Sequence, residues 1–265
     1  MIALFTEAGR AALSEFLTKP ALCLFDFDGT LAPLASDPDR VSLPRPIQQR
    51  LQALQPRTPV GIITGRSLSD MQKRLTFEPD YVIGNHGLEG LPGWQRCAPA
   101  YYATCRGWKL ALSALRKNID DKLWIEDKAY SLTVHYRHAA DPSSVEHALL
   151  AQFSQLLPPP RIIAGKFNFS LLPPNAGDKG QAVQQLLKLS PGSRALYVGD
   201  DQTDEDVFAL HHPEIFSIRV GHETRTAASY GIADHTSIVT LLDWLMVLLP
   251  AEVPEKPLVF GTHRS

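Results

Sequence analysis

The sequence predicts an α/β protein with a parallel-sheet core covered by helices and a smaller α+β domain inserted into that core. Short apolar runs at residues 21–25, 60–63, 81–83 and 195–198 each lead directly into Gly, Asp or Thr. Such runs, without polar alternation, are typical of strands buried on both faces, as in a parallel sheet between helical layers. Helical patterns at 67–75, 178–189, 203–211 and 236–249 separate or follow these runs.

The inserted domain is predicted from a change of pattern in the middle of the chain. A helix at 106–118 precedes the strand pair 123–127 and 131–137, and a helix at 143–157 precedes the pair 161–164 and 167–172. Strands in adjacent pairs indicate an antiparallel sheet with helices on one face. We therefore predict a core domain of residues 1–104 and 174–265 and an inserted cap domain of residues 105–173. The tail after Pro250 is predicted to be a loosely held end.

Composition and charge narrow the range of partners. The 26 basic and 28 acidic residues form no basic run, which argues against a nucleic-acid or membrane-surface partner. No apolar run is long enough to span a membrane, and Glu7 and Arg10 interrupt any signal-peptide pattern. The three cysteines show no metal-ligand spacing, and their odd number does not suggest a disulfide framework. We expect a soluble cytoplasmic protein and take a monomer as the starting hypothesis.

Two carboxylates directly follow the first buried run, in Asp26-Phe27-Asp28-Gly29-Thr30. One carboxylate can attack phosphorus while also binding a metal, and the other can move protons. An acidic turn is the alternative interpretation, because Asp and Gly are common turn residues. In open parallel sheets the ligand site lies beyond the carboxyl ends of the strands. We therefore expect Asp26 and Asp28 to face the residues that end the other strands.

A second group of carboxylates, Asp200, Asp201 and Asp204, follows the run at 195–198. Like charges ~4 Å apart repel by about 4 kcal/mol at an effective dielectric constant of about 20. A hard divalent cation with oxygen ligands, such as Mg²⁺, would relieve this repulsion. Asp201 and Thr203 are candidates to cap the next helix, with Thr203 preferred.

Two further segments offer groups for a phosphate. Thr64-Gly65-Arg66 ends the second run with a hydroxyl and backbone N–H groups, although Thr64 could also be an ordinary helix cap. Lys179 begins a predicted helix, where the helix dipole disfavours positive charge. A bound phosphate would offset this cost, and a solvated surface lysine is the alternative.

Together these four segments resemble the haloacid dehalogenase superfamily of phosphotransferases. The superfamily carries an Asp-x-Asp-x-Thr motif, a Ser or Thr after the second strand, a Lys, and a final acidic loop. The segments occur here in that order across the whole predicted core. The resemblance implies a haloacid dehalogenase-like (Rossmannoid) core, Asp26 as nucleophile and Mg²⁺ held by Asp26, Asp200 and the backbone carbonyl of Asp28. It also implies that Thr64 and Lys179 bind the phosphoryl oxygens. Asp204 would support the site from behind the residues that touch the phosphate.

A finer resemblance is to the trehalose-6-phosphate phosphatases. It rests on Phe25–Pro33, Gly84-Asn85-His86-Gly87-Leu88-Glu89, His135-Tyr136-Arg137 and Gly199–Asp206. It implies an inserted α/β cap and sugar contacts from Glu126, Lys128 and Arg137, together with His86 or Glu89. From the residues alone, Glu126 to Lys128 could equally be a solvated hairpin edge and His86 a structural loop residue.

One departure concerns the segment that re-enters the core. The family usually carries Gly-Lys-x-x-x-Glu-x-Arg/Lys-Pro, and this chain has Ser170 in place of the carboxylate and Leu172 in place of the cation. A serine cannot make the charge-assisted bonds to sugar hydroxyls that a carboxylate makes. Sucrose phosphate and glucosyl- or mannosyl-glycerate phosphates are therefore alternative substrates. A phosphosugar mutase and a non-catalytic sugar-phosphate-binding regulator are the alternatives from other classes.

Overall fold

The computed structural model describes residues 1–35, 38–190, 192–223 and 225–251, so the predicted loose tail lies almost entirely outside the described residues. The chain divides into two compact units. The first contains Met1–Leu91 and the chain from Gly177, and the second is Pro92–Ala176. The second unit begins earlier than residue 105, because its first helix begins at Ala98 rather than at residue 106.

The first unit is built on a seven-stranded, entirely parallel sheet in the order β1-β11-β10-β9-β2-β3-β4. The strands are β1 (Ile2–Ala3), β2 (Ala21–Phe25), β3 (Val60–Ile63), β4 (Tyr81–Ile83), β9 (Arg194–Gly199), β10 (Ile215–Val220) and β11 (Tyr230–Ile232). Four of them are the apolar runs of the sequence. β10 is an unpredicted central strand, because Ser217 and Arg219 interrupt its apolar pattern.

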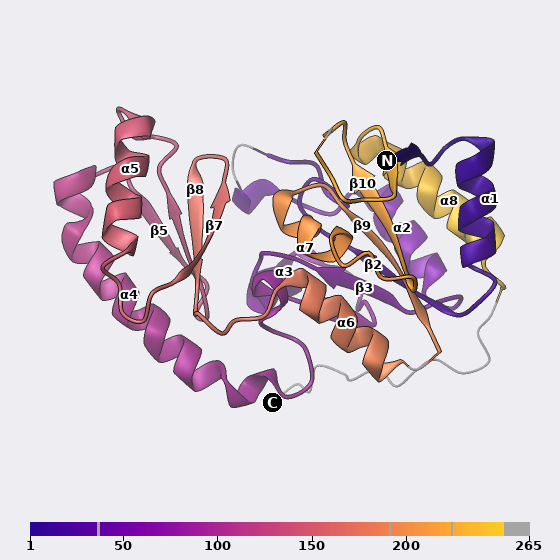
Figure 1. Cartoon of the computed structure of the whole chain (residues 1–265), viewed down its shortest axis with the longest axis horizontal. Helices are drawn as coiled ribbons and strands as arrows, with labels where there is room; N and C mark the ends of the chain where they lie inside the picture. Colours follow the sequence, from indigo (N-terminus) through magenta and orange to yellow (C-terminus); the bar gives the residue numbers. More distant parts are fainter. Residues whose placement is uncertain (36–37, 191, 224, 252–265) are drawn as a thin grey trace. The chain divides into compact units, whose positions relative to one another are not determined.

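Helices cover both faces of this sheet (Figure 1). The helices are α1 (Glu7–Phe16), α2 (Arg45–Leu54), α3 (Leu68–Arg74), α6 (Lys179–Leu189), α7 (Glu205–Phe208) and α8 (Ile238–Leu248), and the short 3₁₀ helices are η1 (Pro38–Arg40), η2 (Asn85–Gly87), η4 (Gln202–Asp204) and η5 (His235–Ser237). One buried cluster joins the sheet to α1, α2, α3 and α8. A second cluster joins the other face to α6 and α7. Burial on both faces explains why the strands are apolar throughout.

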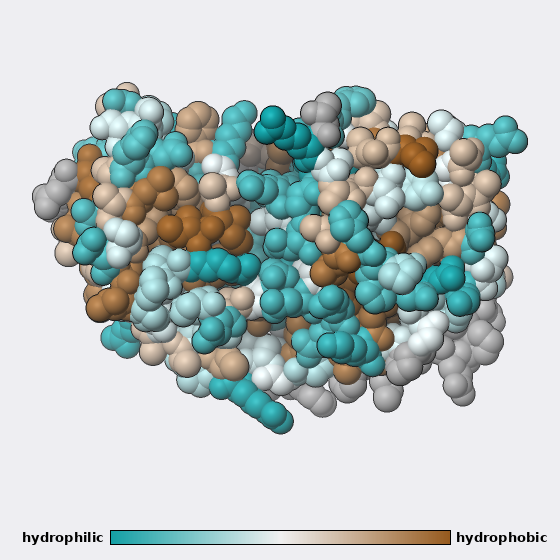
Figure 2. Space-filling model, in the orientation of Figure 1, coloured by the Kyte–Doolittle hydropathy of each residue, from teal (hydrophilic) through white to brown (hydrophobic). Residues whose placement is uncertain are grey.

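The second unit has a four-stranded antiparallel sheet in the order β5-β6-β8-β7. Its elements are η3 (Trp94–Arg96), α4 (Ala98–Ile119), β5 (Trp124–Asp127), β6 (Leu132–His135), α5 (Pro142–Phe153), β7 (Arg161–Gly165) and β8 (Asn168–Leu172). Both helices lie on one side of the sheet (Figure 1), and one buried cluster joins them to it. Exposed apolar residues gather over the strands of this unit (Figure 2). The predicted α/β core with an inserted α+β domain is therefore confirmed.

The strand register brings the predicted site residues to one edge of the core sheet. Phe25, the last residue of β2, pairs with Ile62 of β3 on one side and with Val198 of β9 on the other. Because all these strands are parallel, the residues that follow them emerge at the same edge. No helix in the described part of the chain is both long and apolar enough to cross a lipid bilayer.

Candidate active site

Asp26 and Lys179 form a buried ion pair at the carboxyl edge of the sheet. The Lys179 Nζ lies 2.6 Å from Asp26 Oδ1 and 2.7 Å from Asp204 Oδ1. Lys179 is only 1% exposed, which excludes the surface-lysine interpretation. Burial works against the charge of this ammonium group, but the carboxylates of Asp204 and Asp26 outweigh it and raise the pKa of Lys179. Lys179 therefore stays charged and neutralises part of the carboxylate cluster.

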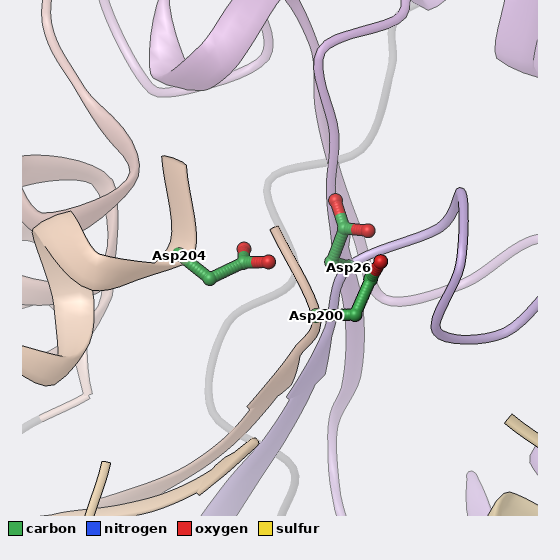
Figure 3. Close-up of side chains that lie close together, drawn as sticks. All are labelled: Asp26, Asp200 and Asp204. Carbon is green, nitrogen blue, oxygen red and sulfur yellow. The ribbon is translucent and has the colours of Figure 1, made fainter. Parts of the chain in front are cut away.

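Three carboxylates meet at this edge, those of Asp26, Asp200 and Asp204. Each offers an oxygen, and these oxygens all lie within 4.8 Å of one another. Figure 3 shows Asp26 and Asp200 side by side, with the Asp204 side chain directed toward them. Burial raises the pKa of Asp26, and Lys179 opposes this effect. Burial, followed by the neighbouring Asp204, raises the pKa of Asp200 to about 7. A set of close, buried carboxylate oxygens suits a hard divalent cation such as Mg²⁺.

Asp200 is held in place by residues to which we assigned no role from sequence. The Thr30 hydroxyl donates to Asp200 Oδ1 at 2.9 Å. A Cβ at Gly29 would clash with the Asp200 carboxylate, so a glycine is required where the two loops meet. The Arg219 guanidinium donates to the Asp200 carbonyl at 2.6 Å and pairs with Glu205 at 2.8 Å. Arg219 thus fixes the backbone of the acidic loop.

An open groove of about 400 Å³ lies beside Asp200. Its lining includes Gly29, Leu34, Asp200, Arg219, His222 and His235. Asp204 and Lys179, in contrast, are 0% and 1% exposed. Asp200 is therefore the member of the cluster that borders the groove.

Asp204 is the fully buried member of the cluster. Its Oδ1 accepts hydrogen bonds from Lys179 and from the Tyr197 hydroxyl, and its Oδ2 accepts from the Asp201 N–H at 2.8 Å. Asp201 is the N-cap of η4, so the prediction that Thr203 caps this helix is wrong. The reason is that the Asp204 side chain binds the Asp201 backbone in a capping box, which starts the helix two residues earlier than a cap at Thr203 would.

Asp28 is bound to Arg66 rather than to the other carboxylates. The Arg66 Nε and Nη2 donate to the two Asp28 oxygens at 2.7 and 2.6 Å. The same guanidinium pairs with Asp70 at 2.8 Å and donates to the Pro38 carbonyl at 3.1 Å. The Arg66 side chain is only 10% exposed. The guanidinium also lies over the Phe27 ring, 5.8 Å from its centroid. Contact of Arg66 with substrate remains a prediction.

Thr64 and Gly65 form the turn after β3. Thr64 is fully buried, and the N-cap of α3 is Ser67, which excludes the interpretation of Thr64 as an ordinary cap. A Cβ at Gly65 would lie 2.5 Å from His86 Cε1, so the His86 ring packs directly on this turn. His86 has a left-handed backbone, with a φ of 59°. Glu89 is buried, and its Oε2 accepts the Leu68 N–H at 2.7 Å, where it holds the start of α3.

The predicted sugar-contacting residues of the second unit lie on β5 and just after β5 and β6. The Glu126 Oε2 lies 3.0 Å from His135 Nε2 and 3.9 Å from Lys128 Nζ. The Trp124 ring stacks on the His135 ring with centroids 4.5 Å apart. Arg137 is exposed. These contacts form a polar patch with an aromatic residue beside it, and the roles of its members in sugar binding remain predictions.

Ser170 and Leu172, the two residues that depart from the family pattern, lie on β8 of the same sheet. The Ser170 Oγ lies 3.1 Å from the Thr133 Oγ1, and both residues are buried. Leu172 is 0% exposed. Glu126, Thr133 and Ser170 face one another across three neighbouring strands. A carboxylate at position 170 would therefore lie in the same cross-strand row as Glu126.

Some residues of the core site carried no sequence signal that we used. The clearest available signal was Tyr197, the one side chain with a polar atom in the run Ala195-Leu196-Tyr197-Val198. A hydroxyl in a buried strand needs a partner, which could have led to Asp204. Arg219 gave no such signal, because its strand was not recognised.

Comparisons with known proteins agree with this geometry. The family model described as "Trehalose-phosphatase" matches residues 24–236. The trehalose-phosphate phosphatase of Mycobacterium tuberculosis (strain ATCC 25618 / H37Rv) is 30% identical over 240 residues, which are 86% of this chain and 61% of that protein. The chain spans about 60% of the length of the curated relatives that it matches.

Solved structures show the same fold. The crystal structure of a trehalose-6-phosphate phosphatase related protein has a TM-score of 0.71 and 23% identity, covering 86% of this chain and 98% of that chain. The C-terminal domain of the trehalose-6-phosphate phosphatase of C. albicans has a TM-score of 0.68 and 22% identity, covering 93% and 98%. The fold is thus the haloacid dehalogenase-like one, with a cap domain. Because the family model covers most of the residues, this chain belongs to the trehalose-phosphatase family.

Proposed function

We propose that this protein is a Mg²⁺-dependent phosphatase that hydrolyses trehalose 6-phosphate to trehalose and phosphate through an aspartyl phosphate on Asp26. The observation that carries the proposal is the cluster of buried Asp26, Lys179 and Asp204 with half-buried Asp200 in a member of the trehalose-phosphatase family. The reaction class is phosphoric monoester hydrolysis. The three cysteines are free, in keeping with a reducing cytoplasm, and a monomer remains our expectation.

In the first step, a carboxylate oxygen of Asp26 attacks phosphorus and the sugar oxygen leaves. Asp28 gives its proton to that oxygen. Thr64 and Lys179 hold the non-bridging phosphoryl oxygens. The negative charge of the transition state is spread over these oxygens, so most of the electrostatic stabilisation arises there. When bound, Mg²⁺ held by Asp26, Asp200 and the Asp28 carbonyl would offset the negative charge of the carboxylates and the phosphoryl group.

In the second step, Asp28 takes a proton from a water molecule, whose oxygen attacks phosphorus and frees Asp26. The Asp28–Arg66 pair bears on both steps, because both Asp28 oxygens accept hydrogen bonds from the guanidinium, which fix the direction of the carboxylate. An Asp28 oxygen must leave Arg66 before Asp28 can pass a proton to the sugar oxygen. Asp70 and the Pro38 carbonyl keep Arg66 in place while Asp28 moves.

In this proposal the second unit recognises the sugar. Glu126, Lys128 and Arg137 would contact the sugar hydroxyls, with His86 beside the phosphate turn. Glu89 would act mainly by ordering the turn, because its carboxylate holds the start of α3. The cap, predicted at residues 105–173, would exclude bulk water when it closes.

A second candidate substrate is another glycosyl phosphate, of the sucrose phosphate or glucosyl- or mannosyl-glycerate phosphate type. The observation that favours it is the buried pair of Ser170 and Thr133, with Leu172 in place of a cation. The pair lacks the charge with which family members are expected to bind sugar hydroxyls. The chemistry at Asp26 would be the same for either substrate.

A phosphate-release screen over sugar phosphates, with and without Mg²⁺, tests the proposal. We expect release from trehalose 6-phosphate that stops in excess chelator and returns with Mg²⁺. Asp26→Asn, which keeps the side-chain volume but is no nucleophile, should abolish release and retain the fold by circular dichroism. Substantial release by folded Asp26→Asn would refute the aspartyl intermediate. A phosphosugar isomer as product would indicate a mutase, and binding without release would indicate a regulator.

A further inference from the structure

Tyr197 lies beneath the carboxylate cluster and takes no part in the steps described above. It is on β9, between β2 and β10 in the middle of the sheet, and it is 0% exposed. Its hydroxyl oxygen lies 2.6 Å from Asp204 Oδ1. A buried hydroxyl is costly unless it has a partner, so this hydrogen bond accounts for a tyrosine in an otherwise apolar strand.

The hydrogen bonds to Asp204 leave its carboxylate little freedom to rotate. Oδ1 accepts from Tyr197 and from Lys179, and Oδ2 accepts from the Asp201 backbone. A Cβ at Gly199 would clash with the same carboxylate, so Asp204 lies directly over the end of β9. Rotation of the carboxylate would break all three hydrogen bonds.

Lys179 depends on this fixed carboxylate for its position. Its ammonium group lies 2.7 Å from Asp204 Oδ1 and 2.6 Å from Asp26 Oδ1. A lysine side chain has four methylene groups and many rotamers, so the charged group needs a fixed partner to hold one position. Asp204 is that partner, and it holds the ammonium group beside the nucleophile. The hydrogen bonds thus run from Tyr197 through Asp204 and Lys179 to Asp26.

We propose that Tyr197 is a positioning residue that sets Lys179 against Asp26 by fixing the Asp204 carboxylate. The inference rests on the proposed phosphatase function and adds a residue to it. The ring itself has a separate packing role, because it belongs to the buried cluster between the sheet and α6 and makes an edge contact with Phe208. A phenylalanine would preserve that packing, so the hydroxyl is the group that serves the site.

Tyr197→Phe tests the hydroxyl, and Tyr81→Phe is the matched control. Tyr81 is buried in the same cluster but lies on β4, away from Asp204. With p-nitrophenyl phosphate, kcat of Tyr197→Phe should fall about tenfold, as expected for loss of one hydrogen bond to a charged group. KM should stay within about twofold, and the inhibition constant of vanadate, a mimic of the pentacoordinate phosphorus, should rise about tenfold. Tyr81→Phe should leave all three quantities within about twofold.

A double-mutant cycle shows whether Tyr197 acts through Asp204. In an Asp204→Asn background, Tyr197→Phe should lower kcat by less than about twofold, because the acceptor charge is already absent. A further tenfold fall there would overturn the inference. So would unchanged kcat and vanadate inhibition in Tyr197→Phe alone.

A crystal structure of Tyr197→Phe gives a readout that does not depend on activity. Lys179 Nζ should be displaced from Asp26 Oδ1 by more than the coordinate error, and an unchanged position would overturn the inference. The two proposals can fail separately. A wild-type protein that turns over no sugar phosphate would refute the proposed function, whereas the crystal structure would still decide the role of Tyr197.

Discussion

Replacing Lys179 with methionine should destabilise the metal-free protein and make its stability depend more strongly on Mg²⁺. Methionine keeps a long unbranched side chain and removes the charge. The substitution leaves Asp26, Asp200 and Asp204 with oxygens within 4.8 Å of one another and without the ammonium group that pairs with two of them.

The magnitude follows from the two ion-pair distances of 2.6 and 2.7 Å. At an effective dielectric constant of about 20, each attraction is roughly 6 kcal/mol before desolvation is counted. Desolvation cancels much of this, and removing one partner of a buried ion pair typically costs about 3–5 kcal/mol. In a protein of about this size, each kcal/mol lowers Tm by about 2–4 °C. We therefore expect a fall in Tm of roughly 6–20 °C in chelator.

Thermal and urea unfolding in chelator and in Mg²⁺ would measure this effect. Lys188→Met is the matched control, because Lys188 is an exposed lysine on the same helix α6, and its Tm should not change. Added Mg²⁺ should raise the Tm of Lys179→Met by more than it raises that of the wild type, because the cation then offsets charge that the lysine no longer neutralises. Equal Tm values in chelator for Lys179→Met and wild type would refute the reasoning.

The raised pKa of Asp200, about 7 against an ordinary value of 3.8, predicts a pH dependence. The folded state then binds more protons than the unfolded state between about pH 4 and pH 7, so metal-free stability should fall across this window as pH rises, by at most about 4 kcal/mol. Urea unfolding in chelator at several pH values measures this contribution, and Mg²⁺ should abolish it. Lys128→Ala and Arg137→Ala should lower kcat/KM for a disaccharide phosphate about tenfold or more but change that for p-nitrophenyl phosphate by less than about threefold. Equal losses on both substrates would show that these residues act in the chemistry or in folding and not in sugar recognition. Arg66→Lys should reduce turnover of alkyl phosphates more than that of p-nitrophenyl phosphate, because it loses the two hydrogen bonds that orient Asp28, and only the alkyl leaving group needs a proton from Asp28. A uniform loss would contradict this orienting role for Arg66.

The convergence of Asp26 and Asp200 could be predicted from sequence, because both directly follow apolar runs and parallel strands end at one edge. The position of Lys179 at a helix start was also informative, since a cation there needs a compensating charge. The structure supplies that charge from Asp26 and Asp204. These inferences needed only local pattern and one rule of sheet topology.

Other features depend on tertiary contacts that no local pattern encodes. The Asp28–Arg66 pair joins residues 38 positions apart, and a Thr-Gly-Arg turn is equally compatible with an arginine that faces a phosphate. β10 escaped prediction because Ser217 and Arg219 are buried polar residues with tertiary partners. The start of α4 was placed too late, because Ala98–Cys105 contains no Leu, Ile, Val, Met or Phe to mark a helix face.

The pairing of β2 with β9 has a consequence for how the protein is made. Every strand pair of the second unit joins residues between Trp124 and Leu172, so these pairs need no strand from outside that segment. β2 can pair with nearby β3, but its other partner, β9, begins only at Arg194. Contacts between such distant segments form slowly, since a long loop must close first. We therefore expect the two halves of the carboxylate cluster to meet after the strand pairs of the second unit have formed.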